Sequence, residues 1–391
     1  MVAMHAQLGD RSLFPDLRAG AYLAHAAISP LSLPVAESLR AGVALGETGG
    51  LAAFPHLIER ADAARDGFAR LIGARPGEVA RVSSTSAGVS AIASALALRS
   101  GDRVVLFEGE FPTNVTPWQA AARARGAQVV FVPLAPFQRS LKEGLAALDA
   151  ELARGCALVA VSAVQFQTGL AMPLAEIAER AHAVGARVFV DGIQAVGATP
   201  LDVVATGIDF LACASHKWLM GPMGAGFLFV AQAARAELEP LSVGWVSHVD
   251  FDAFLFGPGE LRYDRPLSSD ARVFEQGVHN FLGLCGLAAS IELLEGLGAE
   301  AIWNHVQAYL DRVEPELVAR GWRSLRHAEP AGRSTIASFA PPAGVDTQHV
   351  VESLGEAGVA VTGPDGLLRI APHWPNASAE LELLTAALDR I

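Results

Sequence analysis

The sequence predicts an α/β fold in which helices cover both faces of a mainly parallel sheet, followed by a smaller α+β domain. The first observation is a regular alternation of short apolar runs with longer helix-like segments. Such alternation is typical of strand–helix–strand crossovers, which join parallel strands. The second is that polar or charged residues stand directly after several apolar runs, where sheets of this kind bind their ligands.

The alternation is clearest between residues 86 and 230. Helices are expected over 86–98, 118–125, 141–153 and 174–184, and strands over 104–108, 129–133, 158–162, 188–191 and 227–230. Glu108, Ser162 and Asp191 each end one of these strands. Because the carboxyl ends of parallel strands share one edge of the sheet, we expect these side chains to converge there.

The length of 391 residues allows more than one domain. Residues 1–20 are expected to form an N-terminal segment that packs on the small domain or at the active-site mouth, 21–283 a large domain and 284–391 a small one. The small domain should start with an amphipathic helix from Leu284. Strands near 335–342 and 367–371, a helix near 347–357 and a last amphipathic helix follow.

Composition excludes several classes of protein. The net charge is −12 with no cluster of Lys and Arg, so neither nucleic acid nor an anionic membrane is an expected partner. Three cysteines without paired spacing argue against a disulfide framework and against a metal site. The N-terminus lacks the features of a signal peptide, and no run reaches the about 20 apolar residues of a membrane span. We expect a soluble cytoplasmic protein.

The stretch from Val188 to Val230 carries the main chemical signal, because Asp191 ends an apolar run and Lys217 lies between two others. A lysine in an apolar pocket loses its proton easily and can form a Schiff base with the aldehyde of pyridoxal 5'-phosphate (PLP). A carboxylate beside the PLP ring nitrogen keeps that nitrogen protonated. Each residue alone is more simply explained as a loop cap or a surface charge, so the indication rests on the pair.

The same stretch resembles the class V aminotransferase family of fold-type-I PLP enzymes. The resemblance rests on Asp191, on Gln194 three residues later, on His216-Lys217, and on the turn Gly221–Gly224. It implies a three-layer αβα large domain, PLP as cofactor, a small amino-acid substrate and a homodimer.

Further candidates for the cofactor site lie upstream. Thr85 and Ser86 begin an apolar helix, where backbone N–H groups and the helix dipole favour a phosphate, although plain helix capping explains them too. Phe111 is the candidate for stacking on the PLP ring, with a simple core position as the alternative.

The family often offers a polar group to the phenolic oxygen of PLP. Gln165 and Gln194 are both able to serve here, and Gln194 is preferred because it lies in the more specific motif. His216 is expected to serve the phosphate or to orient the lysine–cofactor linkage, with a structural role as the alternative.

For the substrate, the resemblance assigns the α-carboxylate to Arg369, whose guanidinium can pair with a carboxylate through two hydrogen bonds. His25, in a segment expected over the active-site mouth, and Asn114 are further candidates. The stretch 272–280 resembles a family motif that reaches the phosphate of a neighbouring subunit. Val278 stands there in place of a threonine, so His279 or Asn280 would have to compensate.

The expected reaction is transamination or cleavage at Cβ of a small α-amino acid. Racemisation of the isopenicillin-N-epimerase kind and hydrolysis of the kynureninase kind are alternatives. Desulfuration of cysteine or selenocysteine is less favoured, because the stretch 358–366 lacks the family's loop cysteine. A catalytically silent binding protein is the remaining alternative, and Lys217, Asp191 and Arg369 together argue against it.

Overall fold

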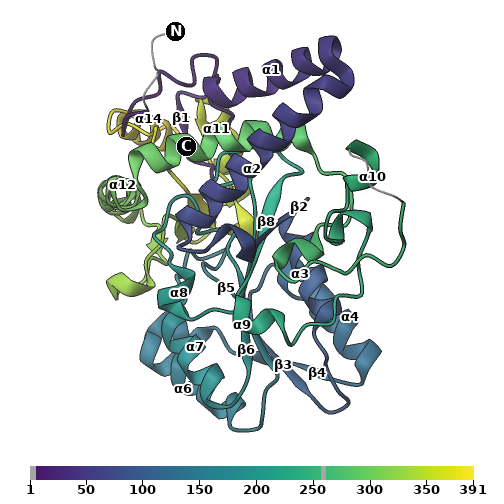
Figure 1. Cartoon of the computed structure of the whole chain (residues 1–391). Coiled ribbons are helices and arrows are strands. Elements are labelled where there is room, and N and C mark those ends of the chain that lie inside the picture. The colour runs from purple at the N-terminus through teal and green to yellow at the C-terminus, as the bar shows by residue number, and fades with distance from the viewer. Residues whose placement is uncertain (1–5, 257–260) are drawn as a thin grey trace.

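The computed structural model describes residues 6–256 and 261–391. Its centre is a seven-stranded sheet with strand order β2-β8-β7-β6-β5-β3-β4 (Figure 1). Its strands are β2 (Val79–Val82), β3 (Arg103–Phe107), β4 (Gln128–Val132), β5 (Leu158–Ser162), β6 (Arg187–Asp191), β7 (Phe210–Ala214) and β8 (Gly226–Val230). Neighbouring strands run parallel, except that β8 is antiparallel to both β2 and β7.

Helices cover both faces of this sheet. Successive side chains of a strand point to opposite faces, so a strand with apolar residues throughout has apolar side chains to bury on both. In β3, Val105 and Phe107 pack in one apolar cluster, and Val104 and Leu106 pack in the other. The three-layer αβα arrangement predicted from the sequence is therefore confirmed. The helices around the sheet are α1 (Leu33–Gly49), α2 (Phe54–Leu71), α3 (Thr85–Ala95), α4 (Thr116–Arg125), α5 (Ala135–Arg139), α6 (Leu141–Leu152), α7 (Leu174–Ala183), α8 (Val203–Thr206), α9 (Gln232–Arg235), α10 (Ala253–Phe256) and α11 (Phe281–Leu297).

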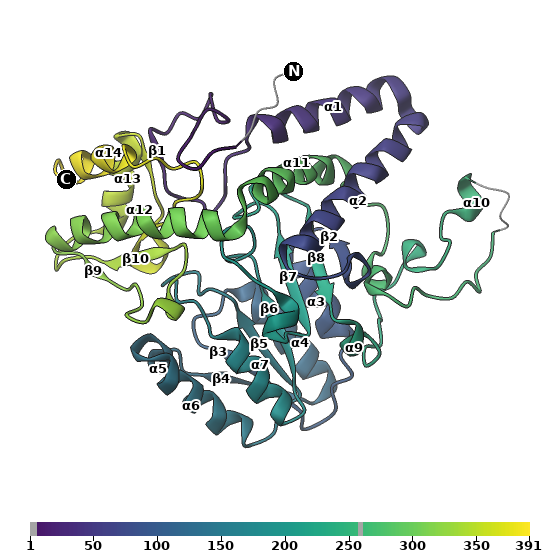
Figure 2. The same cartoon turned by 60° about the vertical axis from the view of Figure 1, so that its left-hand side comes forward.

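The C-terminal part is a smaller α+β unit. An antiparallel sheet of order β12-β10-β9 packs with three helices beside the large sheet (Figure 2). Its elements are α12 (Ala299–Ala319), β9 (Arg323–Ser324), β10 (Ala337–Ala340), α13 (Thr347–Glu356), β11 (Val359–Ala360), β12 (Leu368–Ile370) and α14 (Glu380–Leu388). No single described helix has the length and apolar character to cross a membrane. Only α11 and α12 taken together would qualify, and the chain bends by 78° between them.

The N-terminal segment lies against this C-terminal part. The strand β1 (Ala21–Tyr22) pairs in parallel with β11. The Gly9 N–H donates to the Trp374 carbonyl at 2.7 Å. Contacts of this kind hold the chain before α1 across the end of the small sheet.

The predicted elements and the observed ones agree where apolar runs are short and well bounded. The strands at 104–108, 129–133, 158–162, 188–191 and 227–230 are found within one residue of their expected ends. The helix expected from Leu284 begins at Phe281 and packs on α1 and α2, two helices that the sequence reasoning did not anticipate. The domain boundary after residue 283 stays a prediction.

Gly197 lies where the backbone approaches the loop that carries Lys217. Its φ of +108° belongs to the region that favours glycine, and a Cβ there would stand 2.3 Å from the Trp218 carbonyl oxygen. The approach leaves no space for a side chain.

We predict that Gly197→Ala lowers the free energy of unfolding by roughly 2–4 kcal/mol, because it adds a backbone clash to conformational strain. Gly185→Ala is the control, since Gly185 also has a positive φ of +79° but no heavy atom within 4 Å of the added Cβ. It should cost about 1 kcal/mol. Urea unfolding of both variants measures the difference, and equal losses would refute the role of the close approach.

Candidate active site

A cavity of about 560 Å³ opens at the carboxyl ends of the parallel strands and is closed on one side by the small domain. Ligand pockets of proteins commonly have this size. The structure brings seven of the residues singled out in the sequence into its wall, namely Thr85, Ser86, Phe111, Asp191, His216, Lys217 and Arg369. They come from five separate stretches of the chain, so it is the fold that gathers them.

Lys217 follows β7 in the lysine loop, defined here as residues 215–222. Burial lowers the pKa of Lys217 to about 8, while the nearby Asp191 opposes that shift and Arg369 adds to it. A lysine with this pKa is neutral in roughly a tenth of molecules at pH 7, far more than an ordinary lysine. It can therefore act as a nucleophile or as a base.

Three successive carbonyls of the lysine loop each accept a hydrogen bond from a distant side chain. Ser29 Oγ donates to the Lys217 carbonyl at 2.6 Å, and Ser290 Oγ donates to the Leu219 carbonyl at 2.7 Å. His373 Nε2 contacts the Trp218 carbonyl at 2.9 Å, while its Nδ1 accepts from the Trp374 N–H, so Nε2 carries the proton. Burial lowers the pKa of His373 to about 4, which keeps this ring neutral. The backbone of the lysine loop is thus fixed from three directions.

Asp191 ends β6 with only 2% of its surface exposed. Its Oδ1 accepts from the Ile193 N–H at 3.0 Å. Burial raises the pKa of Asp191 to about 7, and the hydrogen bond from Ile193 only partly offsets this. A buried carboxylate of this kind is stabilised by a cationic partner, such as a protonated ring nitrogen.

The start of α3 forms the polar end of the cavity. Ser84 caps the helix by accepting from the Ala87 N–H at 3.1 Å, and Thr85 Oγ1 accepts from the Ala214 N–H at 3.0 Å. The first turn of any helix leaves N–H groups without intrahelical acceptors, and the helix dipole favours an anion there. With the Ser86 and Thr113 hydroxyls 2.9 Å apart beside it, this end can receive a phosphate.

Phe111 and Phe166 form an aromatic corner. Their ring centroids lie 5.2 Å apart with the planes nearly perpendicular. Lys217 Nζ lies 5.7 Å from the centroid of the Phe111 ring. Phe111 is 45% exposed, so its ring presents a free face to a flat heterocycle attached at Lys217.

Arg369 enters the cavity from β12 of the small domain. Its Nε donates to Thr362 Oγ1 at 3.0 Å and its Nη1 to the Phe166 carbonyl at 2.6 Å. Burial lowers the pKa of Arg369 to about 10. Within the described part of the chain it forms no ion pair, so its guanidinium can still receive an incoming carboxylate.

Glu110 is a buried acid beside the site that the sequence reasoning missed. Its carboxylate accepts from the Ser162 N–H at 2.8 Å, from Asn114 Nδ2 at 3.0 Å and from Gln165 Nε2 at 3.1 Å. Burial raises the pKa of Glu110 despite these bonds. The position of Glu110 between an apolar strand and Phe111 is the sequence signal that could have identified it.

Asn114 is buried under the turn that carries Phe111 and is absent from the cavity wall. It donates to Glu110 and accepts from Trp118 Nε1 at 3.1 Å. These bonds hold the turn that carries Phe111, and the substrate contact of Asn114 stays a prediction.

His25 and Gln194 also lie behind the cavity wall and do not line it. His25 Nδ1 contacts Ser29 Oγ at 2.8 Å, and burial lowers its pKa well below the ordinary value. Gln194 Nε2 donates to the Ala26 carbonyl at 3.0 Å, and its Oε1 accepts from Trp218 Nε1 at 2.8 Å. Both tie the segment 22–30 to the lysine loop. Ala26, Ala27 and Ile28 of that segment are the residues that reach the cavity.

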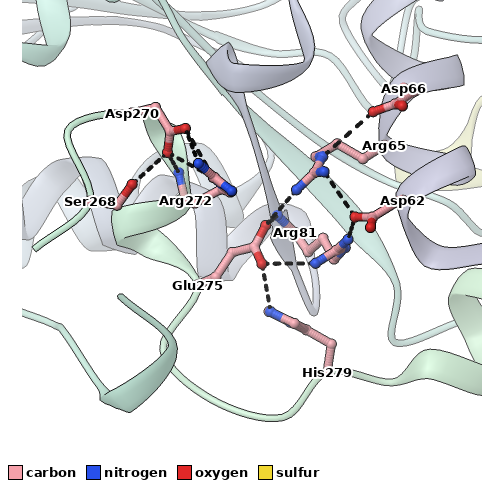
Figure 3. Close-up of polar contacts among 9 residues, drawn as sticks. All are labelled: Asp62, Arg65, Asp66, Arg81, Ser268, Asp270, Arg272, Glu275 and His279. Atoms are coloured by element: carbon pink, nitrogen blue, oxygen red, sulfur yellow. Dashed lines mark hydrogen bonds and ion pairs between the residues drawn. The ribbon is translucent and has the colours of Figure 1, made fainter. Parts of the chain in front are cut away.

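Glu275 anchors the stretch 272–280 in a buried ionic network (Figure 3). Arg81 donates to it through its backbone N–H and Nη1, both at 3.0 Å. Burial alone would raise the pKa of Glu275, but the hydrogen bond from His279 and the charge of Arg81 lower it. The Glu275–Arg81 ion pair thus holds the backbone of the stretch that carries Val278.

The three residues predicted to reach a neighbouring subunit have different surroundings within this chain. His279 Nε2 contacts Glu275 at 3.1 Å, and Asn280 caps α11 by accepting from the Gly283 N–H at 2.9 Å. Val278 is 73% exposed. None of them lines the cavity within this chain, so their cross-subunit role stays a prediction.

Fold and site together are those of an α/β enzyme that binds PLP. The sequence matches the aminotransferase class-V family over residues 22–368. The chain belongs to this family, whose members are enzymes, and its cofactor is PLP.

Relatives and solved structures of several activities resemble it. The chain is 30% identical to isopenicillin N epimerase from Streptomyces clavuligerus over 335 residues, which cover 84% of this chain and 83% of that protein. It is 28% identical to a probable cysteine desulfurase from Methanothermobacter thermautotrophicus over an alignment that covers 96% of each chain. The structure of the cysteine desulfurase CsdA from Escherichia coli superposes with a TM-score of 0.84 at 26% identity, covering 97% of this chain and 96% of that one. A variant of the lyase C-DES, with glycine covalently linked to its PLP cofactor, gives a TM-score of 0.84 at 26% identity over 97% and 98% of the two chains.

The residues of the cavity fit this cofactor. A helix start with hydroxyls suits its phosphate, an exposed aromatic face its ring, a buried acid its ring nitrogen and a lysine of lowered pKa its aldehyde. The buried carboxylate of Asp191 has no ion pair among the described residues. An unpaired buried charge is costly, and a cationic ring nitrogen beside Asp191 would remove this cost.

We predict that Asp191 makes the cofactor-free protein less stable as pH rises. Its folded pKa of about 7 lies above the ordinary 3.8. The folded state therefore holds an extra proton, and the stability it confers is complete below pH ~4 and lost as pH rises through ~7.

Thermal unfolding of the cofactor-free protein across this range should show the decline, and Asp191→Asn should flatten it. Added PLP should raise the melting temperature most near and above pH ~7, where the carboxylate is ionised. An identical pH profile in Asp191→Asn would contradict the assignment.

Proposed function

We propose that this class-V enzyme acts on a small α-amino acid, by transamination or by cleavage at Cβ, with Lys217 as its base. The observation that carries the proposal is that Lys217, with a pKa of about 8, shares one cavity with the unpaired guanidinium of Arg369. One group can take a proton from Cα while the other holds the carboxylate that positions Cα.

The remaining residues supply binding and orientation. The start of α3 with Thr85 and Ser86 holds the phosphate, Phe111 covers a face of the ring, and Asp191 keeps the ring nitrogen charged. When bound, PLP withdraws electrons from the substrate's Cα. His216, half-buried in the same wall, has its pKa lowered first by burial and then by Lys217, so it is neutral near neutral pH.

The three cysteines argue against a persulfide mechanism. None of Cys156, Cys213 and Cys285 lines the cavity. Burial raises the pKa of each thiol, to about 11 for Cys156, so the reactive thiolate is disfavoured. The likeness to a C–S lyase is compatible with Cβ cleavage that uses no enzyme thiol.

A second candidate is inversion at Cα. It is favoured by the 30% identity to isopenicillin N epimerases from Streptomyces clavuligerus and Amycolatopsis lactamdurans. Inversion requires a proton to leave one face of Cα and to return on the other. Lys217 and His216 are the two cavity groups able to carry it, whereas Phe111 is not.

We also propose that the protein is a homodimer. Large apolar side chains between residues 241 and 282 are exposed, including Leu241, Leu261, Tyr263, Val278 and Leu282. Figure 1 shows that much of this stretch runs as a loop beside the sheet, carrying α10 away from it. Large apolar side chains exposed along one segment are a feature of protein interfaces and support the proposal.

A panel of amino acids tests the reaction. PLP-loaded protein should form a keto acid, or a Cβ cleavage product with ammonia, from at least one L-amino acid. Lys217→Ala should abolish product, because it removes the base. Lys142→Ala is the control, since Lys142 is exposed on α6 and is the only other lysine of the chain.

A D-isomer as the sole product would favour inversion instead. Sulfide and alanine from cysteine as the main products would contradict the proposal, as would turnover that survives Lys217→Ala.

A further inference from the structure

The proposed function assigns the charged groups of the cavity, and the assignment leaves one part of the wall without a role. The charged or ionisable lining residues are Asp191, His216, Lys217 and Arg369. Asp191 is taken by the ring nitrogen, Lys217 by the aldehyde and Arg369 by the α-carboxylate. No anion in the described wall remains for a cationic substrate side chain.

Most of the unassigned wall is apolar. It includes Ala27 and Ile28 from the N-terminal segment, Phe166 from the loop after β5, and Pro364 from the turn before β12. Arg369 Nη1 donates to the backbone carbonyl of Phe166, so the arginine expected to hold the substrate's carboxylate is anchored at a residue of this wall. A group attached to Cα extends into the same cavity, where these four residues offer apolar surface.

Hydrogen bonds across the domains hold this wall together. Gln167 Nε2 donates to Asp365 Oδ2, and each partner directly follows a wall residue, Phe166 in one case and Pro364 in the other. Ser338 Oγ donates to the Gln167 carbonyl at 2.5 Å. Asp365 has a φ of +48°, a conformation that non-glycine residues rarely adopt, so the turn is held in a defined shape. The Asp365 carboxylate is engaged by Gln167 rather than turned to the cavity.

The charged groups of the cavity favour the same apolar substrate side chain as the apolar wall does. A second carboxylate on the substrate would have no cation left to pair with, and an amine or guanidinium would approach Arg369 and Lys217, which repel it. Burying an unpaired charge is costly, whereas an apolar group gains from the same wall.

We infer that the substrate is an α-amino acid with an apolar side chain, held between Ile28, Phe166 and Pro364. The inference rests on the proposed function and names its substrate class.

Binding of unreactive carboxylates tests it without turnover. Isocaproate and glutarate are leucine and glutamate without the α-amine, and γ-guanidinobutyrate carries the guanidinium of arginine on a carboxylate one methylene shorter. Calorimetry with PLP-loaded protein should give isocaproate a dissociation constant at least about tenfold lower than either charged compound. Equal or tighter binding of glutarate or γ-guanidinobutyrate would overturn the inference.

A charge introduced in the wall provides the second arm. Ile28→Arg should improve glutarate binding about tenfold or more and weaken that of isocaproate. Leu31→Arg is the matched control, because Leu31 is 40% exposed against 45% for Ile28 but does not line this cavity. It should leave both affinities unchanged. Glutarate affinity that does not rise in Ile28→Arg, or that rises equally in Leu31→Arg, would contradict the position of the side-chain site.

Different results would contradict the proposed function and the substrate class. If PLP does not attach to the protein, the proposed function fails. If PLP attaches and the amino-acid panel gives product while the charged carboxylates bind as well as isocaproate, only the substrate class fails.

Discussion

The burial of Lys217 beside Asp191 is the constraint on which the rest of the structure depends. Removing an ammonium from water lowers its pKa, here to about 8, and removing a carboxylate raises its pKa, here to about 7. Because the two pKa values lie close together, small changes in the surroundings decide whether Lys217 and Asp191 are charged or neutral. A cationic ring nitrogen next to the acid favours the carboxylate, and an aldehyde next to the lysine consumes the neutral amine. The cofactor thereby relieves two costs that folding alone imposes.

The fold holds Lys217 in its buried position by fixing the backbone around it. Three adjacent carbonyls of the lysine loop are bonded by Ser29, His373 and Ser290, which come from the N-terminal segment, the small domain and α11. Gly197 allows a fourth segment to approach without a side chain. These contacts join the N-terminal segment and the C-terminal part of the chain to the lysine loop, so the site is built from segments far apart in the sequence.

The sheet and its ligand-binding edge could be predicted because short β-rich runs end in polar residues, as in β5 and β6. The sequence reasoning left out α1 and α2. Three glycines weaken the helical pattern of α1, whereas α2 has a clear amphipathic pattern that could have been recognised. The roles expected of Asn114 and His25 depended on the direction of each side chain. That direction is set by hydrogen bonds to partners four residues away, Glu110 and Trp118 for Asn114 and Ser29 for His25, and the sequence alone does not tell which of several nearby polar groups each side chain contacts. The wall formed by Phe166 and Pro364 was likewise invisible, because it arises only where two domains meet.

The central claim is that Lys217 is the residue that binds the cofactor, and reductive trapping tests it most directly. The chain has only two lysines, Lys142 and Lys217, so the outcome has few alternatives. After borohydride reduction of the PLP-loaded protein and proteolysis, mass spectrometry should find the phosphopyridoxyl group on the peptide that contains Lys217 and not on the one with Lys142. A modification on Lys142 alone, or on neither lysine, would contradict the account.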